Sequence, residues 1–262
     1  MKSIDTDKIK TVTGKRLGTT ETFHFRCHAS LSCFNKCCRN LNLFLYPYDV
    51  LRLKNSLGIS SDMFLDRHVD VVLREGNYFP EVLLRMADTS EKTCPFLTEA
   101  GCRVYPDRPD ACRNFPVEHG VLFDETGNVS ERLSFFRPPE FCQGQFEGDE
   151  WTLDSWCDDQ ETIGYHEMTV RWAELKRLFQ SNPWGAEGPS GSRAKMAFMA
   201  TYNLDRFREF VLGSSFLKRY RVKPLLINKV RKDDTSLMSF GFAWVKLFLW
   251  GIETSLIKQK RR

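Results

Sequence analysis

The chain of 262 residues lacks an apolar run of the length that crosses a bilayer, about 20 residues. Its nearest approach, Ser236 to Ile252, contains Lys246 and is typical of a buried or amphipathic helix. The aromatic stripe within it, from Phe240 to Trp250, is predicted to be helix core, with a partner groove or a membrane-surface helix as the alternative. The first ten residues are too polar for a secretory signal and have no apolar core region. These absences predict a cytoplasmic protein, in a reducing compartment where thiols stay free.

Catalytic fingerprints are missing as well. The sequence contains no Walker loop, no Gly-rich dinucleotide fingerprint, no nucleophile elbow and no His-Glu-x-x-His motif. A conventional hydrolase or dehydrogenase is therefore not supported, and no catalytic base or nucleophile stands out. Whether the protein is an enzyme is left open by its sequence.

The net charge is small, at +4, but it is divided unevenly along the chain. Residues 1–160 hold 19 Lys and Arg against 25 Asp and Glu, a net charge of −6, whereas residues 161–262 hold 19 against 9, a net charge of +10. A basic half can bind an acidic partner or present a solvated helical surface. We expect the solvated surface and keep a protein partner for this half as the alternative. Nucleic acid binding is not indicated.

Cysteine, in contrast, is abundant, with nine in the chain. Seven of them form two tight groups, Cys27, Cys33, Cys37 and Cys38 in the first and Cys94, Cys102 and Cys112 in the second. Thiolates this close repel one another unless a cation holds them, which favours a soft metal, Zn²⁺ or Fe, as the cofactor. The odd count excludes a complete set of intrachain disulfides.

The spacing within the first group limits its geometry. If residues 33–38 are helical, Cys33 and Cys37 lie on one face and can chelate one ion, whereas Cys38 points about 100° away from Cys37. The neighbouring pair therefore does not easily share one tetrahedral site. Either the two thiols serve two centres, or a turn bends one of them back, or one is a core thiol.

The second group is spaced like a site assembled from loops. Cys94 precedes a proline, Cys102 follows a glycine, and Cys112 lies in a helical turn that prolines bound. Backbone N–H groups at such bends can stabilise thiolate charge. We predict all seven grouped cysteines as metal ligands.

The remaining candidates have weaker cases. Cys157 is predicted to be a core thiol. His24 and His28 flank the first cysteine and could replace a thiolate, although a surface or hydrogen-bonded role is favoured; the other three histidines are isolated and predicted to be structural. Arg108 and Arg113 are expected to brace the second group through hydrogen bonds to carbonyls or thiolates, with ion pairs to neighbouring aspartates as the alternative.

The motifs around these cysteines resemble a known family. The order Cys-x5-Cys-x3-Cys-Cys, Cys-Pro-Phe-Leu, Gly-Cys-Arg-Val-Tyr-Pro-Asp-Arg-Pro and Cys-Arg-Asn-Phe-Pro is similar to the YkgJ-type cysteine-cluster family over residues 23–145. The resemblance implies a domain, of bacterial type, that chelates zinc or iron. It also implies Cys142 as the eighth ligand, with a buried free thiol as the alternative for that residue. The family's first gap is nearer Cys-x2-Cys, so whether Cys27 and Cys33 ligate the same ion is open. Flagellin lysine methylases have a similar cysteine pattern and an iron–sulfur cluster, which keeps that cofactor open too.

Periodicity and turn residues predict an α+β fold. Helices are expected at residues 47–57, from 60 or 61 to 68, 163–179, 195–210 and 237–252, with one or two helical turns at 108–115. Alternation predicts a hairpin at 69–88 and a strand pair around 124–128, and the tail at 258–262 is expected to fray.

Together these features predict a flexible lead at 1–20, a small cysteine-rich metal-binding domain with short helices and a β-hairpin at 21–150, and an α-helical extension at 151–262. Three functions fit them. The first is a protein that chelates zinc or iron through clustered thiolates. The second is an iron–sulfur protein in electron transfer or protein modification, and the third is an interaction module whose metal only holds the fold together.

Overall fold

A computed structural model describes residues 2–3, 9 and 11–260 of the chain. Its contacts divide the chain into two compact units that interleave in sequence. Unit 1 comprises Met1–Leu43 and Arg85–Glu174, and unit 2 comprises Phe44–Leu84 and Leu175–Arg262. Across the described residues, no helix has the length and apolarity needed to cross a membrane.

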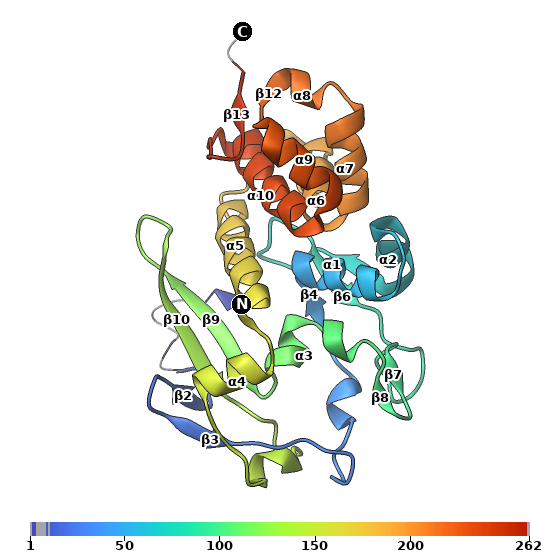
Figure 1. Ribbon diagram of the computed structural model, residues 1–262, viewed down its shortest axis with the longest axis vertical. Coiled ribbons are helices and arrows are strands. Elements are labelled where there is room, and N and C mark those ends of the chain that lie inside the picture. Colours follow the sequence, from blue (N-terminus) through green and yellow to red (C-terminus); the bar gives the residue numbers. More distant parts are fainter. Residues whose placement is uncertain (1, 4–8, 10, 261–262) are drawn as a thin grey trace. The chain divides into compact units, whose positions relative to one another are not determined.

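Unit 1 is built mainly from short strands (Figure 1). Its largest sheet has the order β1-β9-β10-β2, in which β9 and β10 are antiparallel neighbours. The strands of this sheet are β1 (Lys2–Ser3), β2 (Lys15–Leu17), β9 (Val117–Phe123) and β10 (Val129–Phe136). The strand pair predicted around residues 124–128 is therefore confirmed. β2, within the expected lead, pairs with β10, while residues 1, 4–8 and 10 of that lead lie outside the described part.

Smaller pairs and short helices complete unit 1. The strand pairs are β3 (Thr22–His24) with β11 (Glu150–Thr152) and β7 (Leu97–Thr98) with β8 (Gly101–Cys102). The helices are α3 (Asp110–Asn114), α4 (Leu153–Asp159) and most of α5 (Ile163–Phe179). The helical turn predicted before Pro116 and the helix predicted at 163–179 are both confirmed.

Unit 2 begins with the segment that the sequence predicted as helix, helix and hairpin. These elements are α1 (Pro47–Ser56), α2 (Ser61–His68), β5 (Val69–Val72) and β6 (Glu81–Leu84), and all are confirmed. Ser60 caps α2 by accepting a hydrogen bond from the Met63 amide at 3.3 Å, as N-terminal serines do. A third strand, β4 (Phe44–Leu45), pairs with β6 and was not predicted.

The helix predicted at 195–210 is wrong, because two helices occupy this segment. They are α6 (Ser192–Tyr202) and α7 (Leu204–Gly213). Asn203 between them has φ −104° and ψ 68°, outside the helical region, and its side chain caps α7 by accepting from the Arg206 amide at 3.4 Å. The propensity of asparagine for caps therefore outweighs the continuous apolar pattern here.

The core of unit 2 surrounds α10 (Asp234–Trp250), whose aromatic stripe the sequence predicted as helix core. Phe240 and Trp244 are fully buried and lie against Phe207 of α7. Gly241 allows a close crossing with α6, since an added Cβ would stand 2.2 Å from the Ala200 carbonyl oxygen. The prediction for this stripe is confirmed.

The last elements of unit 2 were not expected. They are α8 (Phe216–Arg219), β12 (Tyr220–Arg221), α9 (Pro224–Lys232) and β13 (Lys258–Gln259). β13 pairs with β12, so the prediction of a frayed tail is wrong at Lys258 and Gln259. Residues 261–262 of that tail lie outside the described part.

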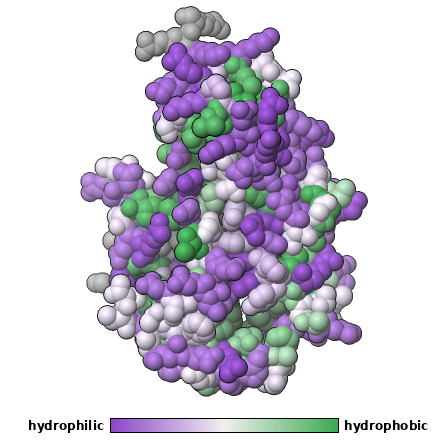
Figure 2. Space-filling model, in the orientation of Figure 1, coloured by the Kyte–Doolittle hydropathy of each residue, from purple (hydrophilic) through white to green (hydrophobic). Residues whose placement is uncertain are grey.

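The α+β class is confirmed, with small antiparallel sheets and a helical C-terminal region. The domain boundaries at residues 20 and 150 stay a prediction, because compactness does not test which part folds by itself. Hydrophilic residues predominate on the face in Figure 2, and hydrophobic ones form small scattered groups there.

Candidate metal centre

The first cysteine group lies in a chain of tight turns. Amide hydrogen bonds span three residues in succession, from Phe34 to the Leu31 carbonyl and from Lys36 to the Cys33 carbonyl. A short 3₁₀ helix, η2, follows at Lys36–Cys38, entered through Asn35 at φ 64°. The α-helical register considered for Cys33 and Cys37 therefore does not form, because this chain is wound more tightly.

Cys37 and Cys38 nevertheless bring their sulfurs together. Their Sγ atoms lie 4.0 Å apart, within the range of a weak S–H hydrogen bond. The bond lowers the pKa of the Cys37 thiol to about 7 and raises that of Cys38 far above its usual value. The shared hydrogen bond thus makes Cys37 the easier of the two thiols to ionise.

The second cysteine group is held by a small hairpin and a helical turn. Cys94 leads into the hairpin, where the Leu97 amide donates to the Cys94 carbonyl at 3.0 Å. Leu97 of β7 pairs with Cys102 of β8, and Gly101 makes the turn at φ 114°, which favours glycine. Cys112 lies on α3, and the thiols of Cys38 and Cys112 are close enough to repel as thiolates.

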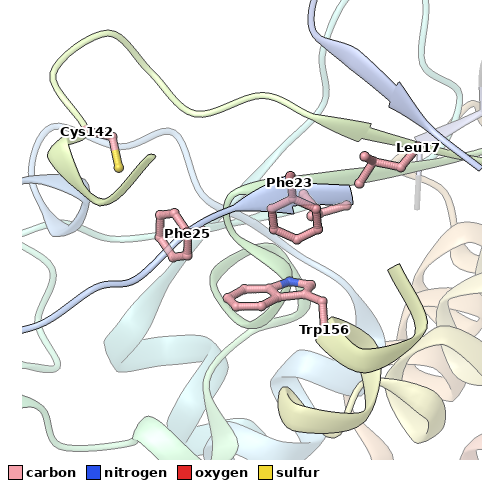
Figure 3. Packing of buried hydrophobic residues seen from close by; sticks show 6 residues of the cluster. Leu17, Phe23, Phe25, Cys142 and Trp156 are labelled. Atoms are coloured by element: carbon pink, nitrogen blue, oxygen red, sulfur yellow. The ribbon is translucent and has the colours of Figure 1, made fainter. Parts of the chain in front are cut away.

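Cys142 lies at the edge of an apolar cluster. The cluster contains Leu17, Phe23, Phe25, Val117, Cys142 and Trp156. In Figure 3 Phe25 lies between Cys142 and the Phe23–Trp156 contact. The Cys142 side chain is 5% exposed, and burial together with the charges of Cys33 and Cys37 raises the pKa of its thiol. Its burial fits the core-thiol alternative, and its thiol neighbours fit the ligand prediction.

Thiol charge is disfavoured across most of the group. Cys27 is exposed as a residue, but the protein atoms around its sulfur desolvate the thiolate; this desolvation, followed by the thiolates of Cys37, Cys142 and Cys33, raises the pKa of Cys27 to about 11. Burial also raises the pKa values of the Cys94 and Cys102 thiols. Because a bound cation reverses this repulsion, such a group ionises together with metal binding and releases protons as it does so.

Two buried arginines brace the second group, as predicted. Arg108 donates to the Tyr105 carbonyl and to the Gln160 side chain, both at 2.6 Å, and stacks over the Tyr105 ring. Arg113 donates to the carbonyls of Pro106 and Gln160. These bonds fix the 3₁₀ turn Tyr105–Asp107 that joins Cys102 to Cys112. The prediction of hydrogen bonds to carbonyls is confirmed; Arg113 also has a long contact to the exposed Glu161, at 3.8 Å.

A polar cluster beside α3 was missed by sequence reasoning. The Nε2 atoms of His119 and His166 each lie 3.0 Å from Asn114 Oδ1, and Asn114 donates to the buried Asp110. Ser134 is 2.8 Å from the other nitrogen of His119. Burial lowers the pKa of His119 to about 3 and also lowers that of His166. The structural role predicted for these histidines is confirmed, but no sequence pattern links them to Asn114.

The remaining candidates are His24, His28 and Cys157. His24 is on the exposed face of β3, between the buried Phe23 and Phe25, and the His28 ring is 3.8 Å from the Glu147 carboxylate. Cys157 lies on α4, where its pKa is raised by burial and then by nearby aspartates rather than by other thiols.

The donor set fits a soft metal in its chemistry. All nine cysteines are free, and eight of them interact with at least one other cysteine. Within the described residues, no three or more His, Cys, Asp or Glu side chains are arranged to hold a metal ion. Cys27, Cys33, Cys37, Cys38, Cys94, Cys102, Cys112 and Cys142 would hold the ion, and their assignment as ligands stays a prediction.

Comparison with known families bears on this group directly. Residues 26–143 match the model of the CxxCxxCC family, whose description is "Putative zinc- or iron-chelating domain". The predicted resemblance to the YkgJ-type family is confirmed. The matched region begins just before Cys27 and ends just after Cys142, and so contains all eight predicted ligands. Searches of curated proteins and of solved structures gave no match.

Proposed function

We propose that the protein binds zinc or iron through clustered cysteine thiolates. The observation that carries this proposal is the gathering of eight free thiols in unit 1, from segments more than 100 residues apart in sequence. The match of residues 26–143 to a chelating domain family supports it independently. Thiolate ligands select soft ions, so zinc, iron or an iron–sulfur cluster is the cofactor class.

The candidate roles differ in which metal the protein binds. A redox-inert zinc ion would hold the loops of unit 1 together or be sequestered there. An iron–sulfur cluster would transfer electrons or support a reaction such as protein modification. Without bound metal, the thiols repel one another when ionised, which supports a role in which the cation completes the fold.

The deciding experiment is anaerobic purification of the full-length protein, followed by metal analysis and a visible spectrum. A colourless protein with stoichiometric zinc indicates a zinc protein, and iron with acid-labile sulfide and broad visible absorption indicates a cluster. Cys157→Ser serves as the control and should keep the metal content of the wild type. A protein that takes up neither metal, even when refolded with zinc or iron and sulfide, contradicts the proposal.

A protein partner for the basic C-terminal helices stays a prediction. The last turn of α9 carries Lys229, Arg231 and Lys232, and Leu225 on the same helix is 71% exposed. A fragment that starts near residue 160 would lose native bonds within unit 2, such as the one from Tyr202 to the Leu45 carbonyl. Capture experiments should therefore use the full chain with α9 charges reversed.

A further inference from the structure

The adjacent pair Cys37–Cys38 lies where two sets of contacts in unit 1 diverge. From Cys38 onward, the backbone joins the second cysteine group. The Cys94 amide donates to the Cys38 carbonyl at 2.8 Å, and the next residue, Arg39, forms a β-bridge with Thr93. Cys38 and Cys94 are thus held side by side by main-chain bonds, which do not depend on side-chain rotamers.

The hairpin of β7 and β8 then brings Cys102 towards Cys94. The Cys94 carbonyl accepts from Leu97, and Leu97 is the partner of Cys102 across β7 and β8. The Phe34 ring lies 4.0 Å from where a Cβ of Gly101 would stand, so the hairpin turn lies against the first cysteine group.

The rest of the first group is joined to the segment around Cys142 instead. The Gln143 amide donates to Cys33 Sγ at 3.2 Å, so the residue after Cys142 contacts the sulfur of Cys33 directly. The Arg26 amide donates to the Gly144 carbonyl at 3.0 Å. A Cβ on Gly144 would stand 2.7 Å from the Arg26 carbonyl oxygen, so glycine is needed for this close approach beside Cys27.

Building on the proposed function, we propose that the eight thiols form two four-cysteine metal centres that meet at the Cys37–Cys38 pair. The first centre consists of Cys27, Cys33, Cys37 and Cys142, and the second consists of Cys38, Cys94, Cys102 and Cys112. Each thiol that ligates gives up its proton to solvent, and the thiols of each centre draw together around their ion.

Chain connectivity places the remaining two thiols, Cys112 and Cys37. Cys112 follows Cys102 through the 3₁₀ turn Tyr105–Asp107, which Arg108 and Arg113 fix by bonds to the Tyr105 and Pro106 carbonyls, so Cys112 is placed with Cys102. Cys37, next to Cys38 in the chain, is then the fourth thiol for the centre of Cys27, Cys33 and Cys142.

The sulfur spacing alone would permit another arrangement. Four thiolates around zinc at about 2.3 Å have sulfurs about 3.8 Å apart, close to the 4.0 Å between Cys37 and Cys38. One ion could therefore take both sulfurs. The main-chain bonds favour the division, because they commit Cys38 to Cys94 and join Cys33 to the Cys142 segment.

The test loads the full-length protein with ¹¹³Cd²⁺ as the sole metal and counts the ions by native mass spectrometry and ¹¹³Cd NMR. The wild type should bind two ions, with two resonances in the tetrathiolate region. Cys33→Ser and Cys142→Ser should lose one and the same resonance, and Cys94→Ser should lose the other. Cys157→Ser, the matched control, should keep both.

Proton–cadmium correlation in the wild type keeps the test decisive if a variant misfolds. It connects the β-protons of each cysteine to its own ion, and should connect Cys37 and Cys38 to different ions. A single bound ion, or one ion that correlates with both residues of the pair, overturns the division and leaves metal binding intact. A wild type that binds neither cadmium, zinc nor iron contradicts the proposed function itself.

Discussion

The two units of the chain are stabilised in different ways. Of the twelve largest fully buried side chains in the described part, ten belong to unit 2, among them Trp184, Trp244 and Phe207, and only Phe96 and Leu133 belong to unit 1. All nine cysteines lie in unit 1. Unit 1 buries fewer of the largest apolar side chains, and clustered thiolates with a metal are a further source of stability for it.

Charge separates the units as well. Unit 1 has 16 Lys and Arg against 22 Asp and Glu, a net charge of −6, and unit 2 has 22 against 12, a net charge of +10. Buried polar groups also differ: unit 1 links His119 and His166 through Asn114, while unit 2 joins Lys54 of α1 to Asp205 of α7 at 3.2 Å. Because all the cysteines lie in unit 1, loss of bound metal should destabilise unit 1 far more than unit 2.

Metal removal should give the largest effect and would test this comparison directly. A structural zinc contributes about 10 kcal/mol or more to the folding of small domains. Chelation should therefore abolish amide protection in β9 and β10 while α6, α7 and α10 stay protected, as measured by hydrogen exchange with mass spectrometry. Added zinc or iron should restore the protection. Equal loss of protection in both units would contradict the comparison.

A cavity in unit 2 should have the next largest effect. Phe207 is fully buried against Phe216, Phe240 and Trp244, so Phe207→Ala should lower the free energy of unfolding by about 3–5 kcal/mol. Denaturant unfolding followed by circular dichroism measures the loss. Bound metal per chain should stay that of the wild type, and Leu225→Ala on exposed α9 is the control, expected to change stability by about 0.5 kcal/mol or less.

A smaller and pH-dependent effect should come from the polar cluster of unit 1. Burial lowers the pKa of His119 to about 3, so the folded protein keeps this ring neutral while the unfolded chain protonates it near pH 6.5. The unfolded state then binds more protons between these values, and stability falls as pH falls through that window. His119→Gln should reduce this dependence by about 1 kcal/mol per pH unit between pH 4 and 6.

Metal content must be followed in the same pH series, because protonation of thiolates releases metal by itself. Samples that keep equal metal at each pH give a valid comparison of the two proteins. An unchanged slope in His119→Gln, under those conditions, would show that the buried ring does not titrate on unfolding.

Local chemistry explains why several elements were predictable. Pro47 at the first turn of α1, the Ser60 cap and Gly58 after α1 act within a few residues, and the helices formed as predicted. The single helix predicted at 195–210 was wrong because one residue, Asn203, offers a cap that an apolar pattern does not reveal. β13 was missed because a two-residue strand depends on a distant partner, β12.

For the candidate metal centre, the sequence predicted which cysteines to consider but not which other residues surround them. Cysteine density alone marked the thiols, and motif resemblance named the family that the match at residues 26–143 confirms. Neither could reveal the Asn114 link between His119 and His166, since His166 lies 52 residues from Asn114 and meets it only in the folded unit.

Composition and periodicity were enough to establish the number and grouping of the thiols, the α+β class and the aromatic core of α10. Which distant segments meet became visible only in the folded chain. The main-chain bond from the Cys94 amide joins Cys38 to the second cysteine group, and the Gln143 amide joins Cys33 to the segment around Cys142. Spacing could not show this, because hydrogen bonds between remote segments form only when the chain has folded.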